Sequence, residues 1–118
     1  MDDFSGFLPY IDVKGGLARL MNNKKFYAKM LRSYLASTTF ESMSEPLNAG
    51  NFESAREKVH TFKGVCANLS LAKNFELSKS LEAVVKEGGD FSAVLAELKA
   101  SVEATELSAN QLIALFEA

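Results

Sequence analysis

The chain has 118 residues, of which 47% are hydrophobic and 24% charged, and its net charge is −2. This length and composition predict one compact domain over residues 1–118. No apolar run approaches the ~18 residues of a membrane span, and Met1-Asp2-Asp3 lacks the basic region of a signal peptide, so we expect a cytoplasmic protein without a membrane segment. One histidine and one cysteine are too few for a zinc site, and we expect no metal and no cofactor.

Helical periodicity runs through the whole chain, and no strand alternation, internal repeat or low-complexity linker interrupts it. The first predicted helix is short. Asp12 caps it, it ends near Met21, and two glycines weaken its intrinsic helical tendency. Its stability must therefore come from packing against the other helices.

The second predicted helix carries apolar residues at helical spacing and ends at Gly50. Asn22 or Asn23 supplies its cap. A proline removes a helical donor and clashes with the preceding turn. Because Pro46 lies in this segment, we expect a kink or a break between residues 37 and 44.

Three further helices complete the chain. The third begins after Asn51 and ends near Leu69. The fourth runs from about Leu71 to Glu87 and is terminated by two glycines. The last is capped by Asp90 and continues nearly to the end of the chain. The fold predicted from these elements is all-α: an antiparallel up-down-up-down four-helix bundle of the second to fifth helices, with the short first helix covering one end.

One face of the third helix is apolar. Its residues recur at intervals of three and four and are expected to face the core: Phe52, Ala55, Val59, Phe62, Cys66 and Leu69. At 100° per residue, His60 lies ~130° from the centre of this stripe, so its imidazole should be accessible to solvent. Cys66 lies on the stripe, and we expect a small core residue rather than a reactive thiol.

The helix surface around His60 is polar or small. The neighbours are Arg56, Glu57, Gly64 and Ala67, with Lys63 at the border. A glycine inside a helix costs roughly 1 kcal/mol relative to alanine, so Gly64 indicates the close approach of another backbone. Five basic and two acidic residues lie between residues 56 and 79, a local charge of +3. This local charge suits an acidic protein partner or a phosphoryl group, and we expect no nucleic-acid binding because no broadly basic surface is present.

The segment His60-Thr61-Phe62-Lys63-Gly64 resembles the motif of the histidine phosphotransfer (HPt) family, which is a histidine, any residue, an apolar residue, lysine and glycine on one bundle helix. The resemblance covers nearly the whole chain through these segments: residues 11–13, 16–17, 19–20, 48–52, 67–69 and 81–82. Phe62 replaces the more frequent leucine. Ser70 stands where similar sequences often carry glycine, which puts the geometry of that loop in question but not the nucleophile.

This resemblance implies that His60 is a phosphoacceptor nucleophile, which exchanges a phosphoryl group with the aspartate of a response-regulator receiver domain. The relay would also include a sensor or hybrid histidine kinase. An imidazole is largely neutral at pH 7, and its unprotonated nitrogen can attack an acyl phosphate. Lys63 would help to hold the phosphoryl group. Glu82 aligns with a position that is polar in some relatives, and it is a candidate to orient the imidazole by a hydrogen bond. The surface that docks the partner would comprise Arg56, Glu57, Gly64 and Ala67.

The chain has no glycine-rich phosphate loop and is too short to include a separate ATP-binding domain. We therefore predict a monomeric phosphocarrier rather than an autonomous ATP-dependent kinase. Two alternatives remain open: a helical interaction module without phosphotransfer, and the phosphoacceptor domain of a larger sensor kinase, although Met1 and the well-finished last helix favour a free-standing protein. A haem-binding bundle with His60 as axial ligand is disfavoured by the outward direction of the ring.

Overall fold

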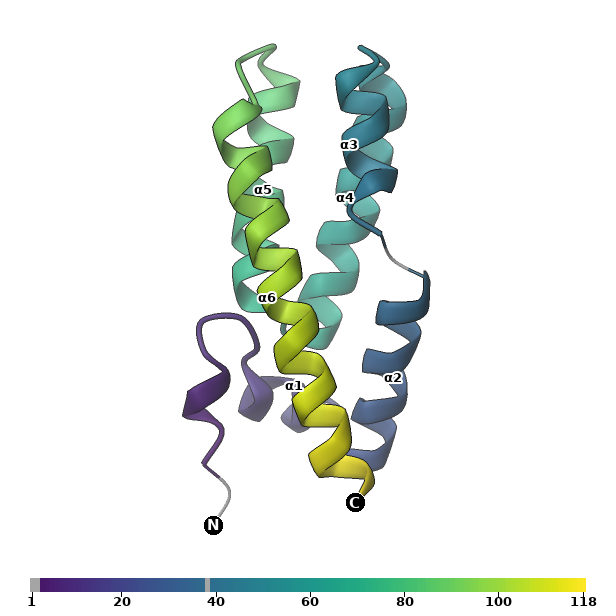
Figure 1. Ribbon diagram of the computed structural model, residues 1–118, viewed down its shortest axis with the longest axis vertical. Coiled ribbons are helices and arrows are strands. Elements are labelled where there is room, and N and C mark those ends of the chain that lie inside the picture. Colours follow the sequence, from purple (N-terminus) through teal and green to yellow (C-terminus); the bar gives the residue numbers. More distant parts are fainter. Residues whose placement is uncertain (1–2, 38) are drawn as a thin grey trace.

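The computed structural model describes residues 3–37 and 39–118. Every regular element among these residues is a helix, which confirms the all-α prediction. In chain order they are the 3-10 helix η1 (Ser5–Phe7) and the α-helices α1 (Val13–Arg19), α2 (Lys24–Ser37), α3 (Glu41–Asn48), α4 (Phe52–Leu69), α5 (Ala72–Lys86) and α6 (Ser92–Glu117). The molecule is elongated, with principal extents of 47 × 23 × 21 Å (Figure 1).

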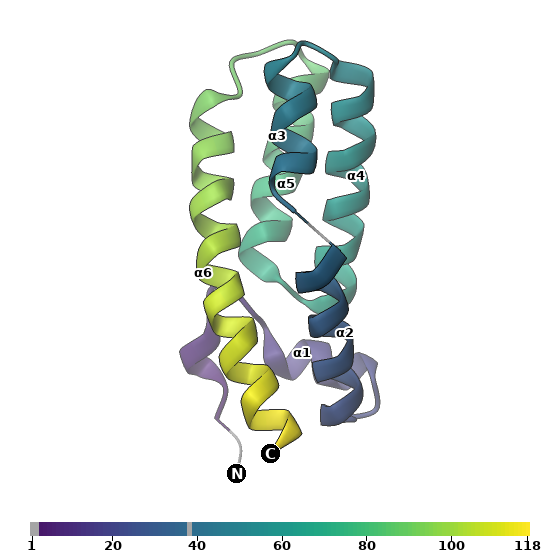
Figure 2. The same ribbon diagram turned by 45° about the vertical axis from the view of Figure 1, so that its right-hand side comes forward.

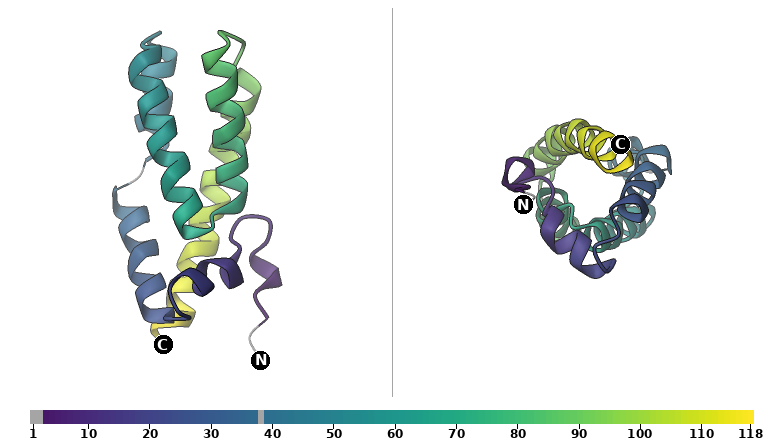
Figure 3. Two further views of the ribbon diagram at one scale, coloured as in Figure 1. Left: turned by 180° about the vertical axis from the view of Figure 1, so that it is seen from behind. Right: turned by 90° about the horizontal axis from the view of Figure 1, so that it is seen from below.

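The long helices lie side by side along the long axis. Figures 1 and 2 show α4, α5 and α6 in this arrangement, with α2 and α3 following one another along the same direction. The short α1 crosses the end of the molecule where α6 ends, as the views from behind and from below show (Figure 3). The helix that bears His60, α4, packs against both α3 and α5.

The predicted second helix is in fact two helices, so the described residues form six α-helices instead of five. The break expected between residues 37 and 44 is confirmed by the end of α2 at Ser37 and the start of α3 at Glu41, although Thr38 lies outside the described residues. Pro46 itself lies inside α3. The helix begins five residues before the proline, so that the missing donor falls in its second turn.

Side chains cap three helices, each by accepting the backbone N–H three residues later, and the caps of α1 and α2 were predicted. The accepting residues are Asp12, Asn23 and Asn51. The predicted cap of the last helix was wrong by one residue. Asp90 accepts the N–H of Ser92 at 2.9 Å, but Phe91 occupies the N-cap position of α6.

The apolar stripe of α4 faces the core, with one exception. The residues that are buried as predicted are Ala55, Val59, Phe62, Cys66 and Leu69. Phe52 was predicted to be buried, but it remains 48% exposed. It is the first residue of α4 and lies at the end of the bundle, where its ring and the Phe91 ring pack at 71° to one another with the centroids 6.3 Å apart. The stripe fixes the rotation of α4 and turns the opposite face towards solvent.

The turn from α4 to α5 is held by the first helix. Ser70 ends α4 in the left-handed conformation, with φ +57°, which is the region that a glycine favours. Its hydroxyl accepts a 2.7 Å hydrogen bond from the Arg19 guanidinium, which also donates to the carbonyl of Ala67. The backbone N–H of Asp12 donates to the carbonyl of Ser70 at 2.9 Å. These contacts help to set the register of α5 against α4.

Candidate functional site

His60 lies on the outer face of α4, and 73% of its side chain is exposed. The helical projection therefore placed the ring on the correct side. The position follows from the sequence, because the buried residues Val59 and Phe62 flank it at spacings that turn the imidazole away from the core. An exposed imidazole is accessible to a second molecule.

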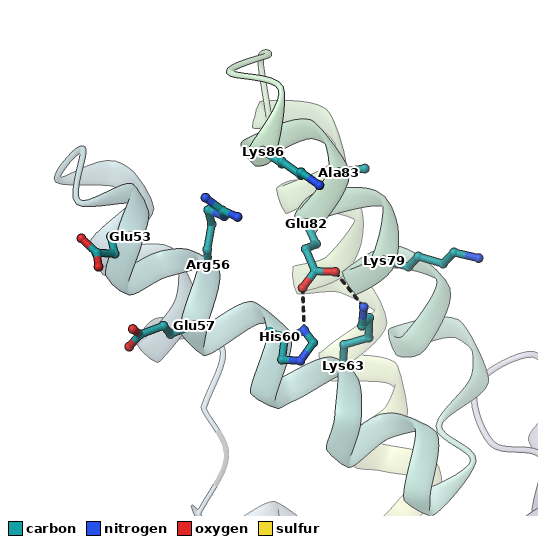
Figure 4. A pocket seen from close by; sticks show the side chains of 9 residues that line it. All are labelled: Glu53, Arg56, Glu57, His60, Lys63, Lys79, Glu82, Ala83 and Lys86. Carbon is teal, nitrogen blue, oxygen red and sulfur yellow. Dashed lines mark hydrogen bonds and ion pairs between the residues drawn. The ribbon is translucent and has the colours of Figure 1, made fainter.

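The imidazole is not isolated on this surface. Its Nδ1 lies 2.9 Å from Oε2 of Glu82, which is on α5 (Figure 4). The carboxylate comes from the neighbouring helix, 22 residues along the chain. The other ring nitrogen, Nε2, points away from Glu82 (Figure 4). The structure thus brings Glu82 to the ring that sequence reasoning suggested it would orient.

Lys63 contacts the same carboxylate. Its Nζ donates to Oε1 of Glu82 at 2.7 Å, so the two carboxylate oxygens are shared between the ammonium and the imidazole. Both charged side chains are partly buried, with 22% of Lys63 and 26% of Glu82 exposed. The hydrogen bond from Lys63, together with that from His60, lowers the pKa of Glu82 from its ordinary value. Glu82 is therefore held as the ionised acceptor beside the ring.

A groove of about 720 Å³ opens between α4 and α5 beside His60 (Figure 4). Its lining residues are Glu53, Arg56, Glu57, His60, Lys63, Lys79, Glu82, Ala83 and Lys86. Of the docking residues expected from the sequence, Arg56 and Glu57 lie in this groove. Gly64 and Ala67 do not. Ala67 instead lines a separate hollow of about 240 Å³ near Arg19.

Gly64 is exposed, one turn along α4 from His60. A Cβ added to Gly64 would have no heavy atom within 4 Å, so nothing inside the molecule requires a glycine there. Gly16 provides the contrast, because a Cβ at that position would lie 2.5 Å from the hydroxyl oxygen of Tyr27. The helical cost of Gly64 thus has no internal explanation in the described residues.

Sequence reasoning missed four lining residues of the groove: Glu53, Lys79, Ala83 and Lys86. Three of them could have been predicted from their helical spacing relative to Glu82. Lys79 and Lys86 lie three residues before and four residues after Glu82, and Ala83 lies four residues after Lys79 and three before Lys86, so these spacings place them on one side of α5. The sequence did not tell which helix would lie opposite that side.

The described residues show neither a metal site nor a membrane-spanning helix. No three His, Cys, Asp or Glu side chains gather there in a way that could hold a metal ion. In the same part of the chain, no helix has the length and apolar character needed to cross a membrane.

Comparison with family models gives a match to the Hpt domain over residues 30–115. The matched region contains α3, α4 and α5 in full and most of α2 and α6. His60, Lys63 and Glu82 all fall inside it. Searches of curated proteins and of solved structures found no match.

Proposed function

Because the chain belongs to the Hpt domain family, whose members are histidine phosphotransfer modules of phosphorelays, we propose that it exchanges a phosphoryl group between His60 and the aspartate of a response-regulator receiver domain. The observation that carries this proposal is the exposed imidazole, with one nitrogen held by Glu82 and the other turned away from Glu82. The response regulator and a histidine kinase are its partners in the relay.

Glu82 prepares the imidazole for attack. An ionised carboxylate can only accept a hydrogen bond, so we assign the proton of the neutral ring to Nδ1. The lone pair then lies on Nε2, the nitrogen turned away from Glu82. As Nε2 attacks the phosphorus, the N–P bond forms, the P–O bond to the aspartyl group breaks, and the carboxylate leaves with its electron pair. The ring retains the Nδ1 proton, and its new positive charge faces Glu82.

Lys63 has two roles in this proposal. It keeps Glu82 ionised through the 2.7 Å hydrogen bond. An ammonium has three donors, so one bond to Glu82 leaves others for the oxygens of a phosphoryl group on His60. Phosphoryl transfer depends mainly on positioning and on charge stabilisation, which a cation at this distance along the helix can supply. Lys63 assists the transfer and is not itself phosphorylated.

The partner docks over the surface around His60. We assign the contacts to Arg56 and Glu57 in the groove and to Gly64 and Ala67 further along α4. Open space above Gly64 supports this assignment, since a side chain there would separate the two backbones. In-line attack needs the reacting atoms ~3–3.5 Å apart, so a small displacement of the receiver would slow the transfer strongly.

The scaffold of this activity is a single domain over residues 1–118, built as an up-down-up-down four-helix bundle. We further propose a monomeric cytoplasmic phosphocarrier that receives its phosphoryl group from another protein and does not phosphorylate itself from ATP. The absence of a P-loop sequence supports this last point.

The proposal is tested by incubating the protein with phosphorylated receiver domains. Wild type should become labelled, and His60→Gln should not, because glutamine offers no nucleophilic ring nitrogen. Since His60 is exposed, this substitution should leave the helicity measured by circular dichroism unchanged. Labelling of His60→Gln at the wild-type level would reject the site. A folded wild-type protein that no receiver labels would favour a helical interaction module without phosphotransfer.

A further inference from the structure

The groove beside His60 contains more positive charge than the transfer chemistry uses. Arg56 projects into it from α4, and Lys79 and Lys86 line it from α5. Among the described residues, none of these three cations has an ion-pair partner. The only ion pairs of the groove join Glu82 to His60 and to Lys63, again within the described part of the chain.

The acidic residues of the groove do not neutralise this charge. Glu82 is already shared between Lys63 and the imidazole. Glu53 and Glu57 point away from α5 in Figure 4, whereas the guanidinium of Arg56 extends towards it. On α5 the groove is lined by the basic Lys79 and Lys86 and, between them in the sequence, by Glu82 and the small Ala83. The ammonium of Lys79 extends away from α4 in Figure 4, at the edge of the groove.

We propose that this groove binds an acidic segment of the receiver domain and so contributes to the choice of partner. The inference rests on the phosphotransfer function proposed above, and it extends the docking surface from α4 to α5. His60 itself lines the groove, so a protein that brings an aspartate to Nε2 must also cover part of it. A surface of carboxylates on that protein would meet Arg56, Lys79 and Lys86.

Such a groove should change the rate at which the two proteins associate more than the rate of the phosphoryl-transfer step. Unpaired charges at a docking surface raise association rates by ~10–10³-fold at low ionic strength, and salt reduces the effect. The α5 lysines do not contact His60, Lys63 or Glu82 through any hydrogen bond or ion pair of the described residues. Reversing their charge should therefore weaken docking and leave the reactivity of the imidazole unchanged.

The experiment compares two double variants with the same change in net charge. The groove variant is Lys79→Glu with Lys86→Glu. The control is Lys73→Glu with Lys99→Glu, two exposed lysines that do not line the groove. Transfer from the phosphorylated receiver that labels wild type fastest is measured at low and at high salt. Direct labelling of His60 by phosphoramidate, a small donor that needs no docking, reports the intrinsic reactivity of the ring.

The groove variant should lose ~10-fold in transfer rate at sub-saturating receiver and low salt, the loss should shrink at high salt, and phosphoramidate labelling should match wild type. The control should behave as wild type in all three measurements. Equal transfer rates of the groove variant and the control would overturn the proposed role of the groove. The proposed function would stand, because wild type would still exchange a phosphoryl group with the receiver. A wild-type protein labelled by phosphoramidate but by no receiver would overturn the proposed function and the groove together.

Discussion

Replacing Glu82 by glutamine removes a charge at the centre of the site with almost no change in shape. In wild type the two carboxylate oxygens accept hydrogen bonds from His60 at 2.9 Å and from Lys63 at 2.7 Å. The amide has one oxygen and one NH₂ group. If its oxygen stays with the ammonium, its NH₂ group faces Nδ1 and favours the ring form that carries its proton on Nε2, the nitrogen that must attack.

The size of the effect follows from the exposure of the pair. A hydrogen bond to a charged group contributes ~1.5–3 kcal/mol when buried. Because 73% of the His60 side chain is exposed, solvent screens the contact, and its contribution is discounted to about 0.5–1 kcal/mol, as for exposed charged pairs. At 1.4 kcal/mol per factor of ten, Glu82→Gln should slow phosphoryl transfer by ~2–5-fold.

Two measurements check this expectation. The transfer rate at saturating receiver reports the chemical step, and ¹⁵N NMR of the imidazole reports which nitrogen carries the proton. Glu82→Gln should reduce the rate and shift the proton from Nδ1 towards Nε2. The variant Glu82→Asp, which keeps the charge but shortens the reach, should be intermediate in both. An unchanged rate together with an unchanged proton distribution would refute the orienting role of Glu82.

Three further outcomes are expected. Gly64→Ala should raise the free energy of unfolding by up to ~1 kcal/mol, because alanine favours a helix and its Cβ meets open space, whereas Gly16→Ala should lower it in the same urea titration because the Cβ would overlap a buried tyrosine hydroxyl. Equal responses of the two glycines would contradict this reasoning. Burial raises the pKa of the Cys66 thiol to about 12, so its alkylation at pH 8 should follow global unfolding, and rapid alkylation of the folded protein would argue against a core cysteine. Lys63 lowers the pKa of Glu82 from its ordinary 4.5, so their ion pair should add stability above that pH and lose it as the pH falls through the lowered value. The difference in unfolding free energy between wild type and Lys63→Met should accordingly disappear in acid, and a difference that persists there would exclude the ion pair as its cause.

The orientation of α4 was predictable because it depends on local periodicity alone. Spacings of three and four place Val59 and Phe62 inside and His60 outside, whatever the rest of the fold. Phe52 fits the same spacing but remains half exposed, because it is the first residue of α4 and lies at the end of the bundle. The spacing of apolar residues does not show where along the helix the core ends.

The break of the second predicted helix was expected, but its position relative to the proline was not fixed by local rules. A proline is disfavoured in a helix interior, yet the structure retains Pro46 in the short α3 and ends α2 at Ser37. Packing decides between these choices, since Met43 and Leu47 of α3 are both buried. Such tertiary gains override the local penalty.

The contact between His60 and Glu82 depends on the register of two helices. That register is set partly by the left-handed Ser70 and by Arg19, which holds the turn from α1. The α1 residue lies 51 positions before the serine in the sequence, so no local pattern relates them. For the same reason the lysines of α5 could not be assigned to the groove until α4 and α5 were placed together.

In the proposed function, His60 both accepts a phosphoryl group and returns it. The most direct measurement is a round trip: label the protein from a phosphorylated receiver, isolate it, locate the phosphoryl group by ³¹P–¹⁵N coupling, and add fresh unphosphorylated receiver. We expect coupling to Nε2 of His60 and transfer of the label to the fresh receiver's aspartate. A label on any other residue, or one on His60 that no receiver removes, would contradict it.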